Sequence, residues 1–396
     1  MKRKFFLFTL FGNGAHALSQ WLVVVLLARW AGVQELGQYA FFLSVFAPLV
    51  LMFNSGLRSV CCSDVNNEFS TESYFYYRVL TVVCFCLIGG GVSVFYPDER
   101  LLIVSILLIK SIESIADLCY GVYQAAGDQY YIFRSLLIRS VCFICTVFLY
   151  LYYNSDFVMA LLVGACCFAF VVYFLDVRPM LTRFKFSGFS ACAEVIPAIF
   201  KSTYMLGLVA LIVSINWNVP RYFLERNFGF EMVGYYSAIL YFVVMGNMVI
   251  NSLCQAVFRE MSERYRNSDG YYLFVARLML GVFVFGLTFM LVSYFFGADI
   301  LHMFYGEKFR QYGYLMFLMS IFSIIIFCSS VLGHALTATR VYSGFIPSYL
   351  FVFFGTIVFA FTVFPGQGIY ASVYTLIAFS VFDFISKSIL FIRMMK

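Results

Sequence analysis

Twelve apolar runs, most of about twenty residues or more, follow one another along the chain with short polar segments between them. A helix needs ~20 mainly apolar residues to cross the hydrocarbon core of a bilayer. Only 12% of the residues are charged, about half the share in an average soluble domain. We therefore predict an all-α polytopic membrane protein. The runs are residues 5–29, 37–60, 74–96, 101–123, 132–153, 157–176, 195–217, 232–256, 272–297, 312–337, 344–364 and 369–391.

The basic residues between the runs predict the orientation. With the N-terminus in the cytoplasm, the inner segments hold thirteen Lys and Arg residues and the outer loops hold five. The positive-inside rule then places both termini in the cytoplasm. The net charge of +6 is scattered among the runs rather than gathered on one face, which argues against nucleic-acid binding. The longest loop, 177–194, is too short for a soluble catalytic domain.

Cysteine and histidine do not indicate a metal or another cofactor. Most of the twelve Cys residues lie inside apolar runs, where they suit helix packing. The three His residues, His16, His302 and His334, are far apart in sequence. The Cys residues do not supply the two closely spaced pairs that would complete a zinc site. We expect no cofactor.

An internal repeat indicates the organisation of the chain. At a constant offset of 197, residues 29–60 share eight identities with residues 226–257, among them Arg29 with Arg226, Gly32 with Gly229 and Gly37 with Gly234. The copies start at the first and seventh runs, so both run in the same direction across the membrane. This predicts two pseudo-symmetric six-helix lobes, 1–176 and 195–396, joined by a cytoplasmic linker, 177–194. Alternating-access transporters hold their site between two such repeats.

Four stretches resemble bacterial polysaccharide transporters of the O-antigen flippase type, which belong to the multidrug/oligosaccharidyl-lipid/polysaccharide (MOP) exporter superfamily. They are "LLARWAGVQELGQYAFFLSVFAPLVLMFNSGLRSV" (26–60), "IESIADLCYGVYQAAGDQYYIFRSLLIRS" (112–140), "VGYYSAILYFVV" (233–244) and "ILHMFYGEKF" (300–309). The resemblance covers the whole chain, but each stretch is a loose pattern of Gly, Tyr and Arg.

The resemblance implies twelve helices in two lobes around a central cavity, and a flippase rather than an enzyme. The implied substrate is an undecaprenyl-diphosphate-linked oligosaccharide, moved from the cytoplasmic to the periplasmic leaflet of the bacterial inner membrane for lipopolysaccharide (O-antigen) synthesis. Ion coupling is expected. The implied partners are membrane lipids and the polymerase and chain-length regulator of the same pathway.

A diphosphate needs cationic groups in a hydrated cavity. Arg29 and Arg58, which close the first two runs, are the main candidates. In the related lipid II flippases an arginine matching Arg29 in its "AR-x-x-G" setting lines the cavity, while Arg58 aligns less securely. The alternative is that either side chain extends to a lipid headgroup or caps a helix C-terminus.

The fourth run carries a polar stripe. Lys110, Glu113, Asp117, Tyr120 and Gln124 recur at steps of three and four residues, so they share one helical face. Such a face must point to protein or water, because charge in the bilayer centre is costly. Lys110 is a candidate for the substrate. Glu113 and Asp117 repel each other, so one can hold a proton for ion coupling; the alternative is a packing role with Arg134 or Arg139.

The second lobe offers fewer candidates. Lys201 and Tyr204 on the seventh run are candidates for the substrate, and Asp383 is a third candidate for ion coupling. Asp383 and Lys387, four residues apart, are first interpreted as an ion pair within one helix. His334 is interpreted as an ordinary polar residue near a helix end.

Several other functions stay open. A drug/cation antiporter of the same superfamily would favour carboxylates over Arg29 and Arg58. An O-antigen polymerase, the enzyme alternative, usually needs a large outer loop, and 298–311 is short. A major-facilitator transporter would usually carry a basic loop after the second run, where this chain has "SDVNNEFSTE". A structural membrane protein would not need so many buried charges.

Overall fold

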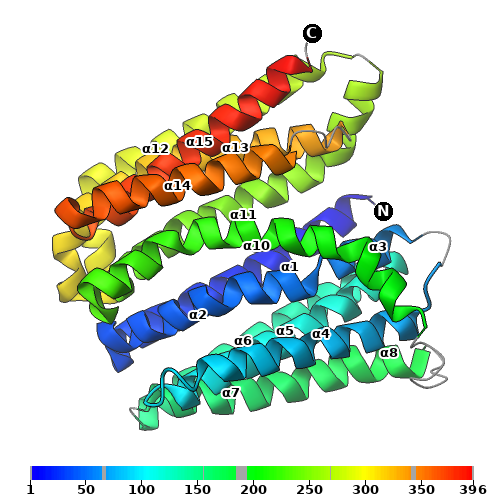
Figure 1. Ribbon diagram of the computed structural model, residues 1–396, viewed down its shortest axis with the longest axis horizontal. Coiled ribbons are helices and arrows are strands. Elements are labelled where there is room, and N and C mark those ends of the chain that lie inside the picture. The colour runs from blue at the N-terminus through cyan, green and yellow to red at the C-terminus, as the bar shows by residue number, and fades with distance from the viewer. Residues whose placement is uncertain are drawn as a thin grey trace. The chain divides into compact units, whose positions relative to one another are not determined.

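The computed structural model describes residues 2–64, 68–154, 156–183, 194–267, 269–339 and 345–394, and within these ranges every regular element is a helix (Figure 1). The first half contains α1 (Lys2–Leu26), η1 (Leu27–Ala31), α2 (Val33–Asn54), α3 (Leu57–Ser63), α4 (Thr71–Val92), α5 (Arg100–Ala125), α6 (Gln129–Tyr153), α7 (Phe157–Val172), η2 (Tyr173–Val177) and α8 (Arg178–Arg183). The second half contains α10 (Ile196–Phe228), α11 (Phe230–Arg266), α12 (Tyr271–Tyr305), η3 (Glu307–Tyr312), α13 (Gly313–Ala338), α14 (Phe345–Gln367) and α15 (Tyr370–Arg393).

Each of the twelve predicted runs coincides with a long helix, which confirms the all-α polytopic fold. Among the described residues, eleven helical segments are long and apolar enough to span a membrane. The remaining long helix is α5, which carries the predicted stripe of Lys110, Glu113 and Asp117. Its charges explain why it differs from the others, because a span can carry such residues only against protein or water.

Several helices continue beyond the predicted runs. The segment 218–230, expected as an outer loop, is helical through Phe228, and α12 continues to Tyr305. At 1.5 Å per residue, the 35 residues of α12 extend over about 52 Å, more than the ~30 Å hydrocarbon core. In α10, polar residues beyond the predicted run form hydrogen bonds within the helix: Arg221 Nη1 donates to Asn218 Oδ1 over 2.6 Å.

The second predicted run is interrupted. Ser55 and Gly56 both adopt left-handed conformations, with φ of 49° and 60°, and they separate α2 from the short helix α3. Arg58 therefore lies on α3 rather than at the end of a continuous span.

Two compact units divide the chain. Unit 1 comprises residues 1–26 and 42–214, and unit 2 comprises 27–41 and 215–396, so α2 and α10 each contribute to both. The predicted lobes 1–176 and 195–396 stay a prediction. Residues 184–193 of the predicted linker lie outside the described residues.

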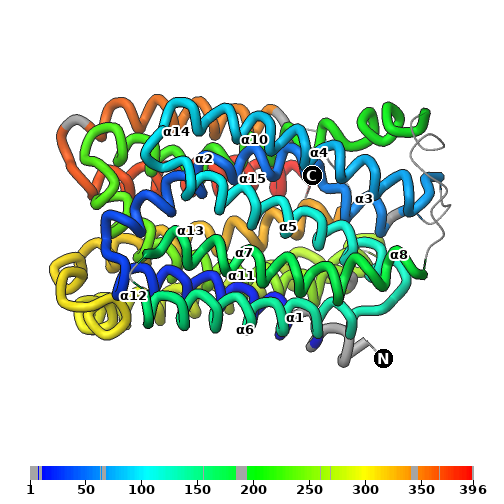
Figure 2. Tube along the Cα trace, turned by 90° about the horizontal axis from the view of Figure 1, so that it is seen from below, coloured from blue at the N-terminus to red at the C-terminus, as the bar shows by residue number. Residues whose placement is uncertain are grey.

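In unit 1, α5 is the central helix. It packs against α3, α4, α6 and α7, while α1 lies along α6 (Figures 1 and 2). Gly121 permits the close approach of α3: a Cβ there would lie 3.2 Å from Arg58 Cα. This approach brings Arg58 beside the polar face of α5.

In unit 2, α13 is the central helix. It packs against α11, α12 and α15, and α14 lies along α15 (Figure 1). Its apolar stretch is 72% buried, the highest share among the eleven described spans.

The repeat has a local structural counterpart. Gly32 and Gly229 both have positive φ (125° and 79°), and each directly precedes a long helix, α2 or α11. One turn later, Gly37 and Gly234 lie where these helices cross within unit 2. A Cβ on Gly37 would fall 1.8 Å from the Phe230 carbonyl oxygen, and one on Gly234 would fall 2.2 Å from that of Val33. Both crossing positions therefore require glycine.

Candidate functional site

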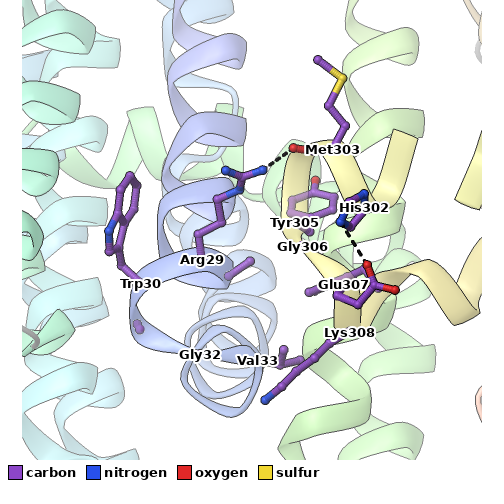
Figure 3. Close-up of a pocket in the computed structure, with 13 residues that line it drawn as sticks. Arg29, Trp30, Gly32, Val33, His302, Met303, Tyr305, Gly306, Glu307 and Lys308 are labelled. Atoms are coloured by element: carbon purple, nitrogen blue, oxygen red, sulfur yellow. Dashed lines mark hydrogen bonds and ion pairs between the residues drawn. The ribbon is translucent and has the colours of Figure 1, made fainter. Parts of the chain in front are cut away.

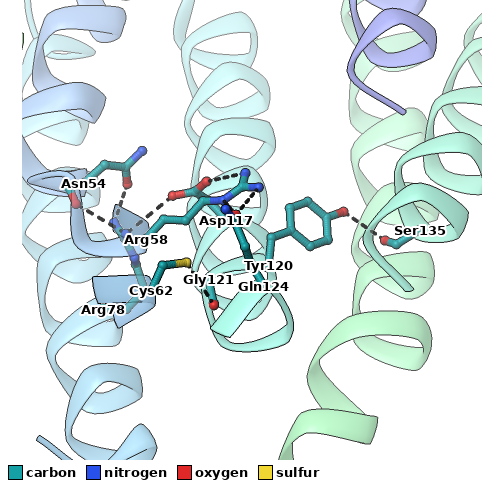
Figure 4. A network of polar contacts seen from close by, with 9 residues as sticks. All are labelled: Asn54, Arg58, Cys62, Arg78, Asp117, Tyr120, Gly121, Gln124 and Ser135. Atoms are coloured by element: carbon teal, nitrogen blue, oxygen red, sulfur yellow. Dashed lines mark hydrogen bonds and ion pairs between the residues drawn. The ribbon is translucent and has the colours of Figure 1, made fainter. Parts of the chain in front are cut away.

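Arg58 is the partly exposed member of a charged cluster in unit 1 (Figure 4). Its Nη1 lies 3.4 Å from Asp117 Oδ1, and its Nε and Nη2 donate to Gln124 Oε1 over 3.2 and 3.0 Å. The guanidinium also lies 5.7 Å from the ring centroid of Tyr120. Three members of the predicted stripe on α5 thus converge on one arginine from α3.

Arg78 of α4 completes this cluster. Its Nη2 lies 3.8 Å from Asp117 Oδ2, and its Nη1 donates to the side chain of Asn54 (Figure 4). The side chain is 1% exposed, and its Nε has no hydrogen-bond partner. Our sequence reasoning did not select Arg78, although a lone arginine inside an apolar run was the available signal. We define Arg58, Arg78, Asp117 and Gln124 as the arginine cluster.

The arginine cluster carries a net positive charge. Two guanidinium groups face one carboxylate, and a single carboxylate leaves several N–H donors available. Guanidinium groups bind phosphate oxygens through paired, charge-assisted hydrogen bonds. Arg58 and Asp117 are 32% and 35% exposed, so both can be reached by a ligand, whereas Arg78 supports them from within the packed core. The charge and the donors of the cluster therefore suit an anion.

The rest of the predicted stripe divides into separate contacts. Lys110 Nζ pairs with Glu113 Oε2 at 2.8 Å within α5. Tyr120 OH lies 2.9 Å from Ser135 Oγ on α6. The expectation that Glu113 and Asp117 share a proton stays a prediction, but in this conformation each carboxylate has its own cation.

Arg29 lines a second site, a pocket of about 790 Å³ in unit 2 (Figure 3). Its Nε donates to the Phe304 carbonyl oxygen over 2.8 Å and its Nη2 donates to that of Met303. These carbonyls belong to the last turn of α12, where helical C=O groups lack intrahelical donors. Arg29 therefore caps a helix C-terminus, as the alternative interpretation allowed, although the helix is α12.

The same pocket contains further charged groups. His302 Nε2 lies 3.0 Å from Glu307 Oε2, and Lys308 also lines the wall. Since Arg29 is exposed as well as bonded, it can still meet a ligand in the pocket; its role with the substrate stays a prediction.

The other predicted residues lie outside these two sites. Lys201 and Tyr204 are exposed on the part of α10 that belongs to unit 1. In unit 2, Lys387 Nζ lies 2.6 Å from Asp383 Oδ2, which confirms the intrahelical ion pair. Asp383 is buried and also accepts a hydrogen bond from Ser329 of α13.

Residues 3–264 match the family model described as "Polysaccharide biosynthesis protein". The chain belongs to this family. It is also 23% identical over 370 residues to the capsular polysaccharide biosynthesis protein CapF of Staphylococcus aureus, a match that covers 92% of each protein.

Solved structures of membrane transporters share this fold. The lipid II flippase MurJ in an inward closed conformation aligns with a TM-score of 0.75 and 14% identity, over 96% of this chain and 86% of that one. The MATE multidrug transporter DinF-BH aligns with a TM-score of 0.73 and 14% identity, over 99% and 95%. The resemblance predicted from sequence is therefore confirmed, and the chain is a multi-pass membrane protein.

Proposed function

We propose that this protein is a flippase that moves an undecaprenyl-diphosphate-linked oligosaccharide from the cytoplasmic to the outer leaflet of the bacterial cytoplasmic membrane by alternating access. Family membership supports a role in polysaccharide synthesis, and the fold is one that a lipid II flippase uses. The observation that carries the proposal is the arginine cluster, in which two guanidinium groups face a single carboxylate inside a helical unit of a membrane protein.

The charge of the substrate explains this choice. A diphosphate must cross ~30 Å of hydrocarbon, whereas the polyprenyl chain can stay in lipid. An isolated guanidinium in the same region would be costly, so it must be paired until a ligand arrives. Asp117 pairs with Arg58 at 3.4 Å, a distance long enough for phosphate oxygens to compete for the same N–H groups. The diphosphate would then replace Asp117 on Arg58 while Arg78 keeps the carboxylate neutralised.

The remaining predicted residues take secondary parts in this proposal. Arg29 and Lys308 would meet the diphosphate in the second pocket, at the predicted outer end of the path. Lys110, Lys201 and Tyr204 are proposed contacts for phosphate or sugar. Both termini are proposed to lie in the cytoplasm, with membrane lipids and the polymerase and chain-length regulator as neighbours.

The glycan is proposed to be the repeat unit of a surface polysaccharide. The Staphylococcus aureus relative is a capsular polysaccharide biosynthesis protein, and the sequence resemblance is to O-antigen flippases. We expect either glycan to be assembled from lipid-linked units. Ion coupling through Glu113, Asp117 or Asp383 stays part of the proposal, although each is paired with Lys or Arg in this conformation.

Deletion of the gene in a glycan-producing host tests the proposal. Lipid-linked repeat units should accumulate on the inner leaflet, where glycosidases added outside intact cells cannot reach them, and the wild-type gene should restore export. Unchanged surface glycan and no accumulated intermediate would contradict a flippase. Resistance of the expressing host to lipophilic cations, with no effect on glycan, would favour the drug/cation antiporter instead.

A further inference from the structure

Asp176 is a buried carboxylate that the sequence analysis did not select. It lies in η2, a π-helical turn between α7 and α8, and its exposure is 0%. Single π turns inside longer helices are rare and are often found at functional sites. The widened turn places Asp176 against α5 and α6 in the interior of unit 1.

The carboxylate has few partners. Its Oδ2 accepts a hydrogen bond from Ser135 Oγ over 2.7 Å, while Oδ1 has no partner. Among the described residues no Lys or Arg nitrogen lies within 4.0 Å of it. Glu113, Asp117 and Asp383 each have such a cation. A fully buried carboxylate without a cation is too costly to stay ionised, so it is stable here only when a proton neutralises it.

The groups that face Asp176 come from two helices, α5 and α6. Cys119, Tyr120 and Tyr123 approach from α5, and Tyr123 OH donates to the Asp176 main-chain oxygen over 2.8 Å. On α6, Ser135 donates to the carboxylate and Arg139 lies nearby. The cations of α8 are engaged elsewhere.

Those α8 cations have partners of their own. Arg178 lies over the ring of Phe174, and Arg183 pairs with Asp128. Neither neutralises Asp176.

Arg139 offers an alternative partner for the ionised form. Its guanidinium lies 5.2 Å from the Tyr120 ring centroid and 5.3 Å from that of Phe168, and its buried Nε has no hydrogen-bond partner. An ionised Asp176 would attract this guanidinium and draw it away from Tyr120. Two arrangements follow: a protonated Asp176 with Arg139 on Tyr120, and an ionised Asp176 paired with Arg139.

Tyr120 connects this pair to the arginine cluster. Its ring contacts the guanidinium groups of both Arg58 and Arg139, and its hydroxyl lies 2.9 Å from Ser135 Oγ (Figure 4). Movement of Arg139 therefore changes the surroundings of Arg58, the proposed contact of the diphosphate.

We propose that Asp176 is a proton-binding carboxylate of this transporter, and that Tyr120 couples its proton to the occupancy of Arg58. In one arrangement the carboxyl group keeps its proton; in the other its O–H bond breaks, the electron pair stays on the oxygen and the proton passes to water. The proposed coupling between Asp176 and Arg58 rests on the proposed function, whereas proton binding by Asp176 does not.

Infrared spectroscopy of the full chain in lipid tests proton binding without any substrate. The wild type should show a protonated carboxyl band at neutral pH, and Asp176→Asn should lose it. The matched control, Asp128→Asn, removes the carboxylate that pairs with Arg183 at an exposed site and should keep the band. An unchanged band in Asp176→Asn would overturn the proposal.

A second variant covers the case in which Asp176→Asn does not fold. Ser135→Ala removes the hydroxyl that donates to Asp176 and so removes support for the ionised form. The band should then persist to higher pH than in the wild type; the same titration as wild type would contradict the proposed site.

Flipping into vesicles with an imposed pH gradient tests the coupling. For one coupled proton, each unit of pH difference should change the equilibrium ratio of substrate between the two leaflets by about tenfold. A sodium gradient should have no effect. Asp176→Asn and Tyr120→Leu should lose the response to pH, the latter because it removes the ring that lies against both guanidinium groups. A full pH response in Asp176→Asn, or a response to sodium alone, would overturn the proposal. No flipping by the wild type would refute the proposed function and leave the infrared result as the test of the site.

Discussion

The central helices of the two units differ in chemistry although they occupy matching places in the repeat, the fourth and tenth runs. The inner face of α5 carries Lys110, Glu113 and Asp117, and α5 falls outside the apolar spans. The inner face of α13 carries hydroxyls instead: Ser320, Ser323 and Ser329 are fully buried. Serine hydroxyls can bond to a carbonyl of their own helix, as Ser320 does to Phe317. Charges need partners from other helices.

This difference assigns separate tasks to the two units. Around α5, ion pairs reach α3 and α4 and leave a net positive cluster that a ligand can enter. Around α13, Asp383 and Lys387 pair with each other and also bond to Ser329, so that their two charges cancel. The surroundings of α5 are therefore suited to an anion, whereas those of α13 are suited to helix packing.

The largest expected effect is on stability, from Arg78→Met. The variant removes a buried cation that donates two hydrogen bonds to Asn54, and it leaves Asp117 with Arg58 as its remaining cation. Since a hydrogen bond to a charged group contributes about 1.5–3 kcal/mol, the cost should be about 3 kcal/mol or more. The matched control is Arg277→Met on α12, where the side chain is exposed. Thermal unfolding in detergent should show a much lower midpoint for Arg78→Met only. Equal midpoints for both variants would remove the contrast between the units.

The next effect is on substrate binding, from Arg58→Ala. Loss of charge-assisted hydrogen bonds costs about 1.5–3 kcal/mol, so flipping at low substrate concentration should fall roughly 10–100-fold. Arg58→Lys should retain part of the activity, since it keeps the charge but loses the planar pair of donors. Protein levels are measured by immunoblot. Equal activity of both variants and wild type would exclude Arg58 from the mechanism.

A smaller effect is expected in unit 2. The double variant Asp383→Asn with Lys387→Met replaces a buried ion pair by neutral groups of similar size, which costs little. Flipping and its pH dependence should stay close to wild type. A lost pH dependence would instead support the ion-coupling role predicted for Asp383.

Two glycines in the central helices give a further contrast. Gly121→Ala would press on the α3 backbone beside Arg58, with a cost of about 1–3 kcal/mol and slower flipping. Gly333→Ala in α13 would meet only the Lys387 side-chain end at 3.5 Å and should be neutral or stabilising by up to about 1 kcal/mol. A larger loss of stability for Gly333→Ala than for Gly121→Ala would contradict the contrast between α5 and α13.

The fold was largely predictable because span length and apolarity depend on the bilayer rather than on tertiary contacts. Helix ends were less so: Asn218 and Arg221 look like loop residues but bond along α10. The break at Ser55 and Gly56 was missed, because a left-handed pair inside an apolar run has no strong sequence signal.

The site was predictable only in part. Helical periodicity placed Asp117, Tyr120 and Gln124 on one face, and the lone charge of Arg58 marked it. Periodicity could not select partners on other helices, so Arg78 was missed. From the sequence, Asp176 resembles a solvated residue at the end of an apolar run. In the structure, the π turn places it in the interior of unit 1.

The most direct test is flipping of a fluorescent polyprenyl-diphosphate-linked oligosaccharide by the purified protein in vesicles, measured by quenching with a membrane-impermeant reductant. With the wild type, the reductant should quench label from both leaflets. The α13 control Ser320→Ala should give the same result. Arg58→Ala should leave the inner leaflet protected. Equal exposure in Arg58→Ala and wild type, or protection in the wild type, would contradict the account.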